Sequence, residues 1–201
     1  MAPELQTERL LLRPFQLEDA AQAQVLFPQW EVVKFLNPKV PWPFPEDEVY
    51  TYYRDIALPA IERGEEWHWT LRLRELPEQL IGAITLVREG RSNREFWLGL
   101  PWQRRGLMTE AVISLNDYWF EVLGFTVLRA PKAVLNVTSR RISEKTGMRV
   151  VAIEESDYVS GRFLKEVWEI TAEEWDVKRA FLRAAHSSDT EAEPPSRRSA
   201  D

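Results

Sequence analysis

Residues 103–111, with the sequence QRRGLMTEA, combine residue types that bind anions. They separate a strand-like segment at 95–100 from an amphipathic segment at 110–123, so we expect the chain to pass from a strand through a tight loop into a helix. The first turn of a helix presents unpaired backbone N–H groups and the positive end of the helix dipole to one point. Arg104 and Arg105 add charge-assisted donors for phosphate oxygens. The pattern predicts a pyrophosphate site, and an ordinary strand–helix turn is the alternative.

Two other phosphate-binding motifs do not fit this loop. The ATP-type loop requires the pattern G-x-x-x-x-G-K-S/T, and no Gly-Lys pair precedes the helix. The dinucleotide fingerprint requires three glycines, of which only Gly106 is present. The loop therefore represents another kind of anion site.

The loop resembles the acyl-CoA loop of the GCN5-related N-acetyltransferases (GNAT), whose pattern is Q/R-x-x-G-x-G/A. Gln103, Gly106 and Met108 occupy its three defining positions, and Met108 replaces the usual small residue. A second stretch, NVTSRRISEKTGM at residues 136–148, resembles the N-x-x-S…K-x-G-F signature of the RimJ/RimL branch, the ribosomal-protein and related N-acetyltransferases. The opening TERLLLRPF at residues 7–15 is similar to the same branch, so the resemblance covers about residues 7–178.

The resemblance implies an α/β (α+β) GNAT fold. This fold has a central mixed, twisted β-sheet of about seven strands, flanked by helices and splayed between the fourth and fifth strands. Composition agrees, since 201 residues of which 44% are hydrophobic can form one sizeable core. We expect a single domain over residues 1–186. Residues 187–201 are rich in Ser, Pro, Glu, Asp and Arg without periodicity, which predicts a disordered tail.

Hydrophobic periodicity predicts alternating strands and helices. Strands are expected at residues 10–13, 67–73, 80–87, 95–100, 127–134, 149–155 and 163–170. Helices are expected at residues 17–27, 46–63 and 110–123, with a short polar helix capped by Thr138 or Ser139 and ended by Gly147, and a last helix opened by a capping box at 171–174. Four prolines predict a loop at 37–45, and Pro77 predicts the turn before the strand at 80–87.

The resemblance also implies that acetyl-CoA lies between the strand before the loop and its parallel neighbour. Leu98, Gly99 and Leu100 would offer backbone groups to the pantetheine arm, with Gly99 at a bulge or close approach, and a free N–H there would stabilise the oxyanion. Asn136 would bind a pantetheine amide, or serve only as a turn or cap residue. The other expected contacts to acetyl-CoA come from the two motifs: Gln103, Arg104, Arg105, Gly106, Leu107, Met108, Thr109, Ser139, Ser143 and Lys145.

Acetyl transfer to an amine requires a neutral nucleophile and a group near the departing thiolate. Glu95, on the strand facing the thioester region, is the first candidate base, directly or through water. Glu166, on a later strand, is the second, and each could instead be a surface carboxylate. Many GNAT enzymes place a Tyr seven positions after the motif Asn to protonate the thiolate, and here that position is Ser143. The branch resemblance points to Ser139 near the sulfur, with helix capping as its alternative role.

Substrate selection is expected in residues 37–63, which cover the acceptor side in this fold. This segment combines aromatic side chains with carboxylates: Trp42, Phe44, Tyr50, Tyr52, Tyr53, Glu46, Asp47, Glu48 and Asp55. Such a surface would suit a cationic amine or a peptide N-terminus, and a solvated acidic helix face beside core aromatics is the alternative. The identity of the acceptor does not follow from the sequence.

Composition restricts the partners. The formal net charge of −6 argues against a general nucleic-acid surface. The absence of Cys excludes disulfides, Cys-ligated zinc and a cysteine acyl-enzyme, and His68 and His186 show no metal-ligand spacing, so no metal is expected. No signal segment or membrane-spanning apolar run is recognisable. We therefore expect a cytoplasmic monomer or homodimer without direct contact to membrane or nucleic acid.

Three functional hypotheses follow. The favoured one is an N-acetyltransferase, in which acetyl-CoA is the co-substrate and a primary amine of a protein N-terminus or a small molecule attacks its thioester. The second is a CoA-binding pseudoenzyme or regulator, because Met108 and Ser143 depart from the family pattern. The third is a ribosome- or RNA-associated binding module that uses residues 102–105 and binds in a salt-sensitive way.

Overall fold

The computed structural model describes residues 2–191, with side chains as far as Ala184. Its strands form two sheets in which every pairing is antiparallel. The first sheet has five strands in the order β1 (Leu5–Gln6), β2 (Leu10–Pro14), β3 (Glu66–Leu73), β4 (Leu76–Val87) and β5 (Arg94–Leu98). The second sheet has the order β6 (Val127–Ala133), β8 (Gly161–Thr171) and β7 (Arg149–Tyr158).

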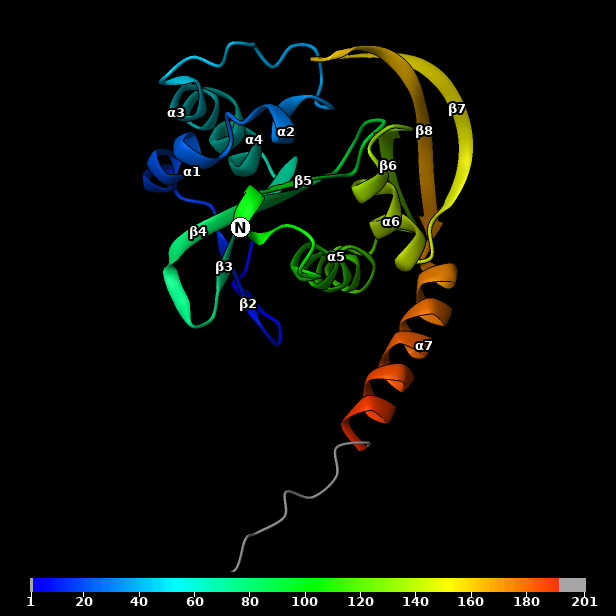
Figure 1. Ribbon diagram of the computed structural model, residues 1–201. Helices are drawn as coiled ribbons and strands as arrows, with labels where there is room; N and C mark the ends of the chain where they lie inside the picture. The colour runs from blue at the N-terminus through cyan, green and yellow to red at the C-terminus, as the bar shows by residue number, and fades with distance from the viewer. Residues whose placement is uncertain (1, 192–201) are drawn as a thin grey trace, which may run out of the picture.

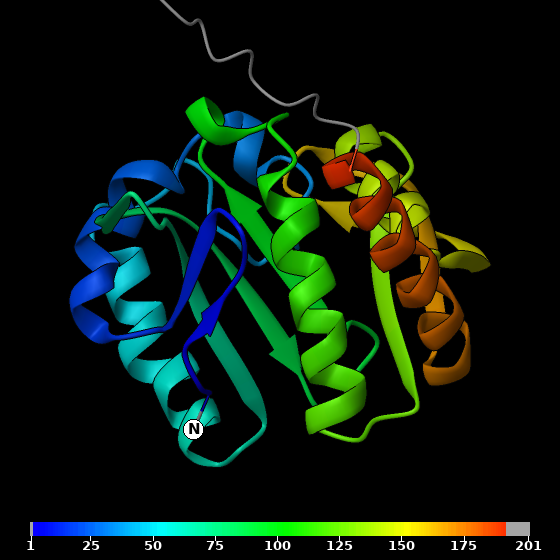
Figure 2. The same ribbon diagram turned by 90° about the horizontal axis from the view of Figure 1, so that it is seen from below.

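Helices cover both sides of the first sheet (Figure 1). On one side lie η1 (Leu17–Asp19), α1 (Ala20–Leu26), α2 (Trp30–Val33), α3 (Glu48–Tyr52), the π-turn η2 (Tyr53–Ala57) and α4 (Leu58–Glu62). On the other side, the short η3 (Leu100–Trp102) leads to α5 (Leu107–Asp117) and its π-helical continuation η4 (Tyr118–Val122). The second sheet carries α6 (Val137–Lys145) and α7 (Ala172–Glu191). Seen from below, α5 stands in front of the junction between the sheets (Figure 2).

The two sheets are joined through Asn93, directly before β5. Its backbone N–H donates to Arg129 O at 2.7 Å, and its side-chain Oδ1 accepts from Arg129 N–H at 2.9 Å. Its Nδ2 donates to Val87 O at 3.1 Å, so one side chain links β4 to β6. Three residues further along each strand, the Lys132 ammonium lies 5.8 Å from the Phe96 ring centroid, which shows that β5 and β6 run in parallel. No β5–β6 ladder forms in the described part of the chain, so the strands separate beyond Asn93.

The hairpin of β7 and β8 reaches back across the molecule to the segment after α2 (Figure 1). At its tip, Val159 N–H donates to Leu36 O at 3.1 Å, and Ser160 N–H donates to Lys34 O at 3.1 Å. The Phe35 and Phe163 rings meet edge to face, with centroids 6.3 Å apart. The second sheet is thereby tied to the first at both the Asn93 junction and the hairpin tip.

The predicted strands and helices are confirmed with small boundary shifts, because their hydrophobic periodicity coincides with burial. The helix expected at 110–123 begins earlier, at Leu107, and buries Val112, Leu115 and Trp119 at helical spacing. The capping box is also confirmed, since Glu174 N–H donates to Thr171 Oγ1 and Thr171 N–H donates to Glu174 Oε2.

Several local predictions need correction. Pro77 lies inside β4 and not in the turn, at a ladder irregularity where no backbone N–H is needed. Asn136, and not Thr138 or Ser139, caps α6. The splay expected between the fourth and fifth predicted strands, 95–100 and 127–134, is confirmed: β5 and β6 separate without pairing, which divides the strands of the described residues into two sheets.

The first residues of the expected tail are helical. Helix α7 continues to Glu191, so residues 187–191 are helical, since adding a residue to an existing helix costs little. Residues 192–201 lie outside the described part of the chain, and the expectation for them stays a prediction.

The Asn93 junction predicts the effect of Asn93→Ala. The substitution leaves Arg129 N–H and Val87 O without their side-chain partner in a buried position, where Asn93 is 8% exposed. We expect the free energy of unfolding, measured by urea titration, to fall by about 1–3 kcal/mol. Ser92→Ala is the matched control, because its hydroxyl reaches only Arg94 O at 3.5 Å, and its stability should be close to wild type. Equal stability of the two variants would contradict the proposed role of Asn93.

Candidate active site

The 103–109 loop has the backbone of an anion site. Arg104 and Gly106 adopt positive φ angles of 61° and 79°, and α5 begins at the next residue. The first N–H groups of α5 have no intrahelical acceptor and face the loop. The side chains of Leu107 and Met108 are buried, so these residues can offer only backbone groups to a ligand.

Among the loop's other residues, the two arginines are exposed. Neither the Arg104 nor the Arg105 side chain forms an ion pair within the described residues, so both guanidinium groups are available to an anion. Thr109 is partly buried. The loop thus combines two unpaired cations with a helix start, which is the arrangement that the sequence predicted.

The N-terminal motif at residues 7–9 holds this loop in place. Thr7 Oγ1 donates to Glu110 Oε1 at 2.5 Å, and Arg9 donates through its backbone N–H at 2.8 Å and its Nε at 2.7 Å to the same carboxylate. Arg9 also donates to the carbonyl of Arg105 at 3.0 Å. Glu110, in the first turn of α5, therefore connects the first strand region to the loop 96 residues later in the chain.

The sequence placed the ligand-binding backbone groups at Leu98, Gly99 and Leu100, and two of the groups in this segment have partners within the protein. Gln103 Nε2 donates to Leu98 O at 2.8 Å, and Gly99 N–H donates to Ile81 O at 2.9 Å. Gly99 does not form a bulge, because the β4–β5 ladder is regular. It is required by a close approach, since a Cβ there would lie 2.9 Å from the Trp102 ring. The Leu98 carbonyl and Gly99 N–H are thus already bonded within the protein.

One side of β5 nevertheless stays open. Leu98 lies opposite Gly82 in the β4–β5 ladder. Because the hydrogen bond is made one residue further along, from Gly99 N–H to Ile81 O, Leu98 and Gly82 form a non-hydrogen-bonded pair. The N–H and C=O groups of Leu98, and of Phe96 two residues earlier, therefore point away from β4. No backbone hydrogen bond to β6 uses these N–H groups in the described residues. The sequence analysis did not propose Phe96 as a source of backbone contacts to a ligand. Nothing in the sequence of an apolar strand indicates which of its backbone N–H groups lack a partner.

The second motif forms α6 beside this gap. Asn136 Oδ1 accepts from Ser139 N–H at 3.2 Å, which is the cap role considered as the alternative to ligand binding. Its Nδ2 donates to no atom of the described residues and can still serve a ligand. Ser143 is fully buried and its Oγ has no hydrogen-bond partner, whereas Ser139 is partly buried and Lys145 is exposed.

Glu95 belongs to a polar row that crosses three strands. It lies opposite Thr85 on β4, which lies opposite His68 on β3. Thr85 Oγ1 and His68 Nδ1 are 3.1 Å apart, and His68 Nε2 is 2.5 Å from Glu66 Oε2. The row faces the side covered by α1–α4, because Trp97, two residues after Glu95, packs edge to face on Phe27, just after α1, with ring centroids 5.3 Å apart.

The environment of Glu95 changes its acidity. Solvent reaches its side chain, yet desolvation by the surrounding protein raises the pKa of Glu95 above its usual 4.5. The nearby Glu66 carboxylate raises this pKa further, and His68 acts in the opposite direction. Tyr52 of α3 is close enough for its pKa to rise to about 12, through desolvation first and then the charges of Glu66 and Glu95.

This row includes two residues that the sequence reading did not propose. Glu66 and His68 alternate along a strand, which placed them on one face, but nothing in the pattern indicated that Glu95 would lie beside them. From the 37–63 segment, only Tyr52 is electrostatically coupled to Glu95. Asp55 is paired with the adjacent Arg54 in an exposed position, so the alternative of a solvated acidic face describes it better.

Glu166 is already engaged. Its carboxylate accepts from Arg140 at 2.7 and 3.0 Å and from Trp168 Nε1 at 3.0 Å. The Arg140 pair fixes α6 to β8, so these contacts favour a structural role for Glu166 over that of a base.

A surface hollow lies apart from this candidate site, at the opposite face of the second sheet. Its lining residues include Arg129, Glu154 and Lys165. Among the described side chains, residues 2–184, no group of three or more His, Asp or Glu is arranged to hold a metal ion. No helix among these residues has the length and apolar character to cross a membrane.

Comparison with known proteins identifies the family. The model of the acetyltransferase (GNAT) domain matches residues 9–149, and the chain belongs to this family. It is therefore an acyltransferase of a family that uses acetyl-CoA. No curated protein sequence matches the chain.

Solved structures share its fold. The ribosomal-protein-S5-alanine acetyltransferase from Vibrio fischeri is 13% identical with a TM-score of 0.73, over 87% of this chain and 99% of that one. The ribosomal L7/L12 alpha-N-protein acetyltransferase RimL, in complex with coenzyme A, is 12% identical with a TM-score of 0.71, over 84% and 98%. A spermidine N-acetyltransferase chimera from Vibrio cholerae is 18% identical with a TM-score of 0.68, over 83% and 97%.

The anchor of the 103–109 loop predicts a pH-dependent stability. Desolvation alone would raise the pKa of Glu110, but hydrogen bonds from Thr7 and Arg9 outweigh it and hold the pKa below its usual 4.5. A carboxylate with a lowered pKa in the folded state stabilises the fold above that usual value and loses this effect as the pH falls. We expect Glu110→Gln to lower the free energy of unfolding by about 1–3 kcal/mol at pH 7, because charged hydrogen bonds are lost.

The difference between wild type and this variant should shrink as the pH falls below 4.5, as measured by urea unfolding at several pH values. Glu75→Gln, at an exposed carboxylate that forms no ion pair among the described side chains, is the control for general charge effects. A difference that stays constant with pH would show that the Glu110 carboxylate does not anchor the loop.

Proposed function

We propose that this protein transfers the acetyl group of acetyl-CoA to a primary amine, either a protein N-terminal α-amine or the amine of a small molecule. The observation that carries the proposal is the open side of β5, whose unpaired Phe96 and Leu98 N–H groups lead to the 103–109 loop. An extended arm with amide groups can pair with these N–H groups while its pyrophosphate reaches the loop. The RimJ/RimL motifs and the similarity to ribosomal-protein acetyltransferases support a substrate with a free N-terminus. A cytoplasmic monomer or homodimer remains the expected form.

In this proposal, the residues that bind acetyl-CoA and the residue that acts as the base lie on different sides of β5. Arg104, Arg105 and the first N–H groups of α5 bind the phosphates, and the Nδ2 of Asn136 donates to a pantetheine amide. The Leu98 N–H is a suitable donor to the oxyanion that forms when the amine attacks the thioester. On the opposite side, Glu95 takes the proton of the incoming ammonium, and its raised pKa makes it a better acceptor of that proton.

The acceptor amine approaches from the side covered by α1–α4. There Glu66 and Glu95 form a negative pair beside Tyr52, which attracts an ammonium group before it is deprotonated. Thioester chemistry needs little activation of the donor, so alignment of the amine contributes a large part of the rate.

Binding is tested first through Gly106. Wild-type protein should show a rise in melting temperature with acetyl-CoA that exceeds the rise with dephospho-CoA or ATP. Gly106→Ala should reduce this rise, because the positive φ of 79° is unfavourable for a residue with a Cβ and the loop must change shape. Gly124→Ala is the matched control, since Gly124 has a φ of 71°, follows the same helical segment, and a Cβ added there would meet nothing within 4 Å. No shift in the wild type would refute the acyl-CoA site.

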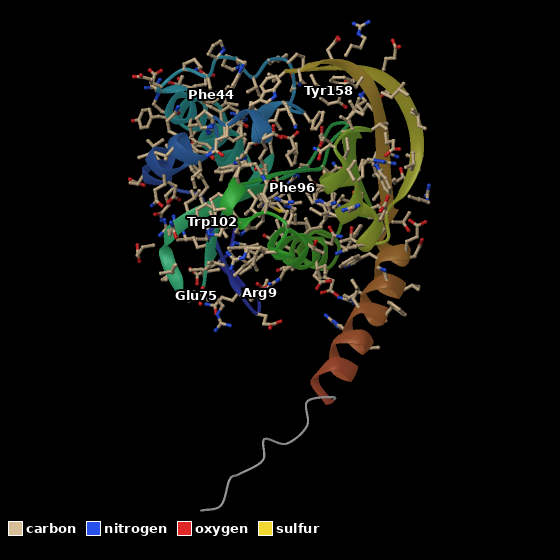
Figure 3. All side chains as sticks on the ribbon, in the orientation of Figure 1. Arg9, Phe44, Glu75, Phe96, Trp102 and Tyr158 are labelled. Carbon is tan, nitrogen blue, oxygen red and sulfur yellow. The ribbon has the colours of Figure 1, made fainter. Side chains whose placement is uncertain are left out.

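Catalysis is tested through Glu95. A base acts only when deprotonated, so kcat/KM should rise as the pH passes through its pKa, which lies above 4.5. Glu95→Gln should lower kcat/KM about 10²-fold or more and remove this rise, with a panel of peptides beginning with Ala or Ser, and spermidine, as acceptors. Glu75→Gln, in the exposed β3–β4 turn (Figure 3), is the control and should keep the wild-type profile.

Two outcomes would count against this reading. An unchanged profile in the Glu95 variant would exclude Glu95 as the base. Specific acetyl-CoA binding without turnover on any acceptor would favour the pseudoenzyme hypothesis.

A further inference from the structure

A buried lysine reaches across the gap between β5 and β6. Lys132, on β6, is 6% exposed, and its Nζ lies 5.8 Å from the centroid of the Phe96 ring on β5. Its one polar contact is a long one, 3.5 Å to Ala130 O. Figure 3 shows Phe96 on the side of β5 that faces α6 and β6. A lysine ammonium has three donors, so this group is under-satisfied as it stands.

The groups around Lys132 do not neutralise it. Arg94, on β5, is 3% exposed and donates to Asn116 Oδ1 of α5 at 2.5 Å and to the Met148 sulfur at 3.2 Å. Neither Arg94 nor Lys132 forms an ion pair with any side chain of residues 2–184. Glu166 lies directly across from Lys132 on β8, but its carboxylate is taken by Arg140 of α6 and by Trp168. Two cations therefore share a buried region without a free carboxylate.

This arrangement has two consequences. Burial lowers the pKa of Lys132 well below its usual 10.5, and the charge of Arg94 lowers it further. Burial also lowers the pKa of Arg94 to about 9. A positive potential without a counter-charge in a water-poor region stabilises negative charge that develops there, at no cost of reorganisation.

The position of Lys132 relates it to the sulfur of a bound donor. The strands are joined at Asn93 and Arg129, and Lys132 is three residues from that junction on the opening side. The phosphate loop follows Leu98, at the open end of β5. An arm that starts at the loop and runs along Leu98 and Phe96 therefore brings its far end, which carries the thioester, towards Lys132.

The other candidates for a proton donor near the sulfur are less suitable. Ser143 occupies the position where a Tyr would act, but its hydroxyl is sealed inside the protein. A serine hydroxyl is also a weak acid compared with a lysine whose pKa is lowered. Lys132 can both carry positive charge and release a proton at this gap, whereas Arg94 is held by Asn116 and Met148.

We propose that Lys132 is the catalytic acid that protonates the departing CoA thiolate, with Arg94 as a positioning residue that holds positive potential beside it. This role rests on the proposed acetyl transfer. As the C–S bond breaks and the new C–N bond is complete, a proton passes from Lys132 Nζ to the sulfur. Glu95 has by then passed the proton of the ammonium to solvent, and it takes the remaining extra proton from the nitrogen of the product. Solvent returns a proton to Lys132, so charge and atoms balance.

Binding of the product tests the proposal without knowledge of the acceptor. Isothermal titration calorimetry would compare CoA with desulfo-CoA, which lacks the sulfur, at pH 7–9. In the wild type, the Lys132 ammonium stabilises the thiolate form of bound CoA and lowers the pKa of its thiol by about one unit, so CoA should bind up to about 10-fold more tightly than desulfo-CoA at the high end of this pH range. Lys132→Met, which preserves the length of the side chain, should abolish this preference and leave desulfo-CoA binding unchanged.

The matched control is Lys165→Met. Lys165 neighbours Glu166 on β8, so its side chain points to the opposite face of the sheet, where it pairs with Glu154 at 2.9 Å. This variant should retain the wild-type preference for CoA. If both ligands bind the wild type but Lys132→Met keeps the preference, the acid role is overturned while acetyl-CoA binding stands. If neither ligand binds the wild type, the proposed function fails as well.

A kinetic measurement separates an acid from a merely structural lysine. An acid must be protonated, so kcat should fall as the pH rises through the pKa of Lys132, which lies below 10.5. Lys132→Met should lower kcat about 10²-fold, leave the KM for acetyl-CoA nearly unchanged and remove this fall at high pH. A variant with wild-type kcat, or with the fall intact, would overturn the proposal. The melting temperature of the Lys132→Met variant should not drop below that of the wild type, because replacing an unpaired buried cation by an apolar side chain removes a desolvation cost.

Discussion

The attachment of β6 to the residue before β5 is the constraint on which the rest of the structure depends. Asn93 bonds to Arg129 with both its backbone and its side chain, and the same side chain reaches Val87. Because this contact joins the strands at one end only, the backbone of Phe96 and Leu98 has no partner on that side. Unpaired N–H groups inside a protein are costly unless something satisfies them, so the open edge is retained where a ligand completes it. The hydrogen bonds of Asn93 thus fix one end of β5 to β6, and the strands separate beyond that point.

Charge is separated across β5 by the alternation of its side chains. Glu95 faces the side of His68 and Glu66, whereas Arg94 and Phe96 face α5, α6 and Lys132. One side is negative and suits an incoming ammonium, and the other is positive and suits a departing thiolate. A period of two in a single strand thus places groups of opposite charge on the two sides of β5. The raised pKa of Glu95 and the lowered pKa of Lys132 both have desolvation as their largest cause.

Contacts between segments far apart in the chain turn the motifs into a site. The 7–9 segment lies between β1 and β2, and its Thr7 and Arg9 hold Glu110 and the carbonyl of Arg105. Gln103, a defining residue of the loop, donates to the Leu98 carbonyl. Motif residues therefore contribute in two ways, some by facing the ligand and others by fixing the backbone that does.

The sequence by itself determined the order of strands and helices and the loop at 103–109, because hydrophobic periodicity and turn chemistry are local properties of the chain. The resemblance of its two motifs indicated the family and made Glu95 and Asn136 candidates for the site. Only the tertiary structure decided which backbone groups of β5 are free, that Asn136 caps α6, and that Glu66, His68 and Glu95 share one row. It alone revealed Lys132, which as a single lysine in an apolar strand reads as a surface residue. These features depend on register and burial, which arise from contacts between distant segments and so leave no local pattern to read.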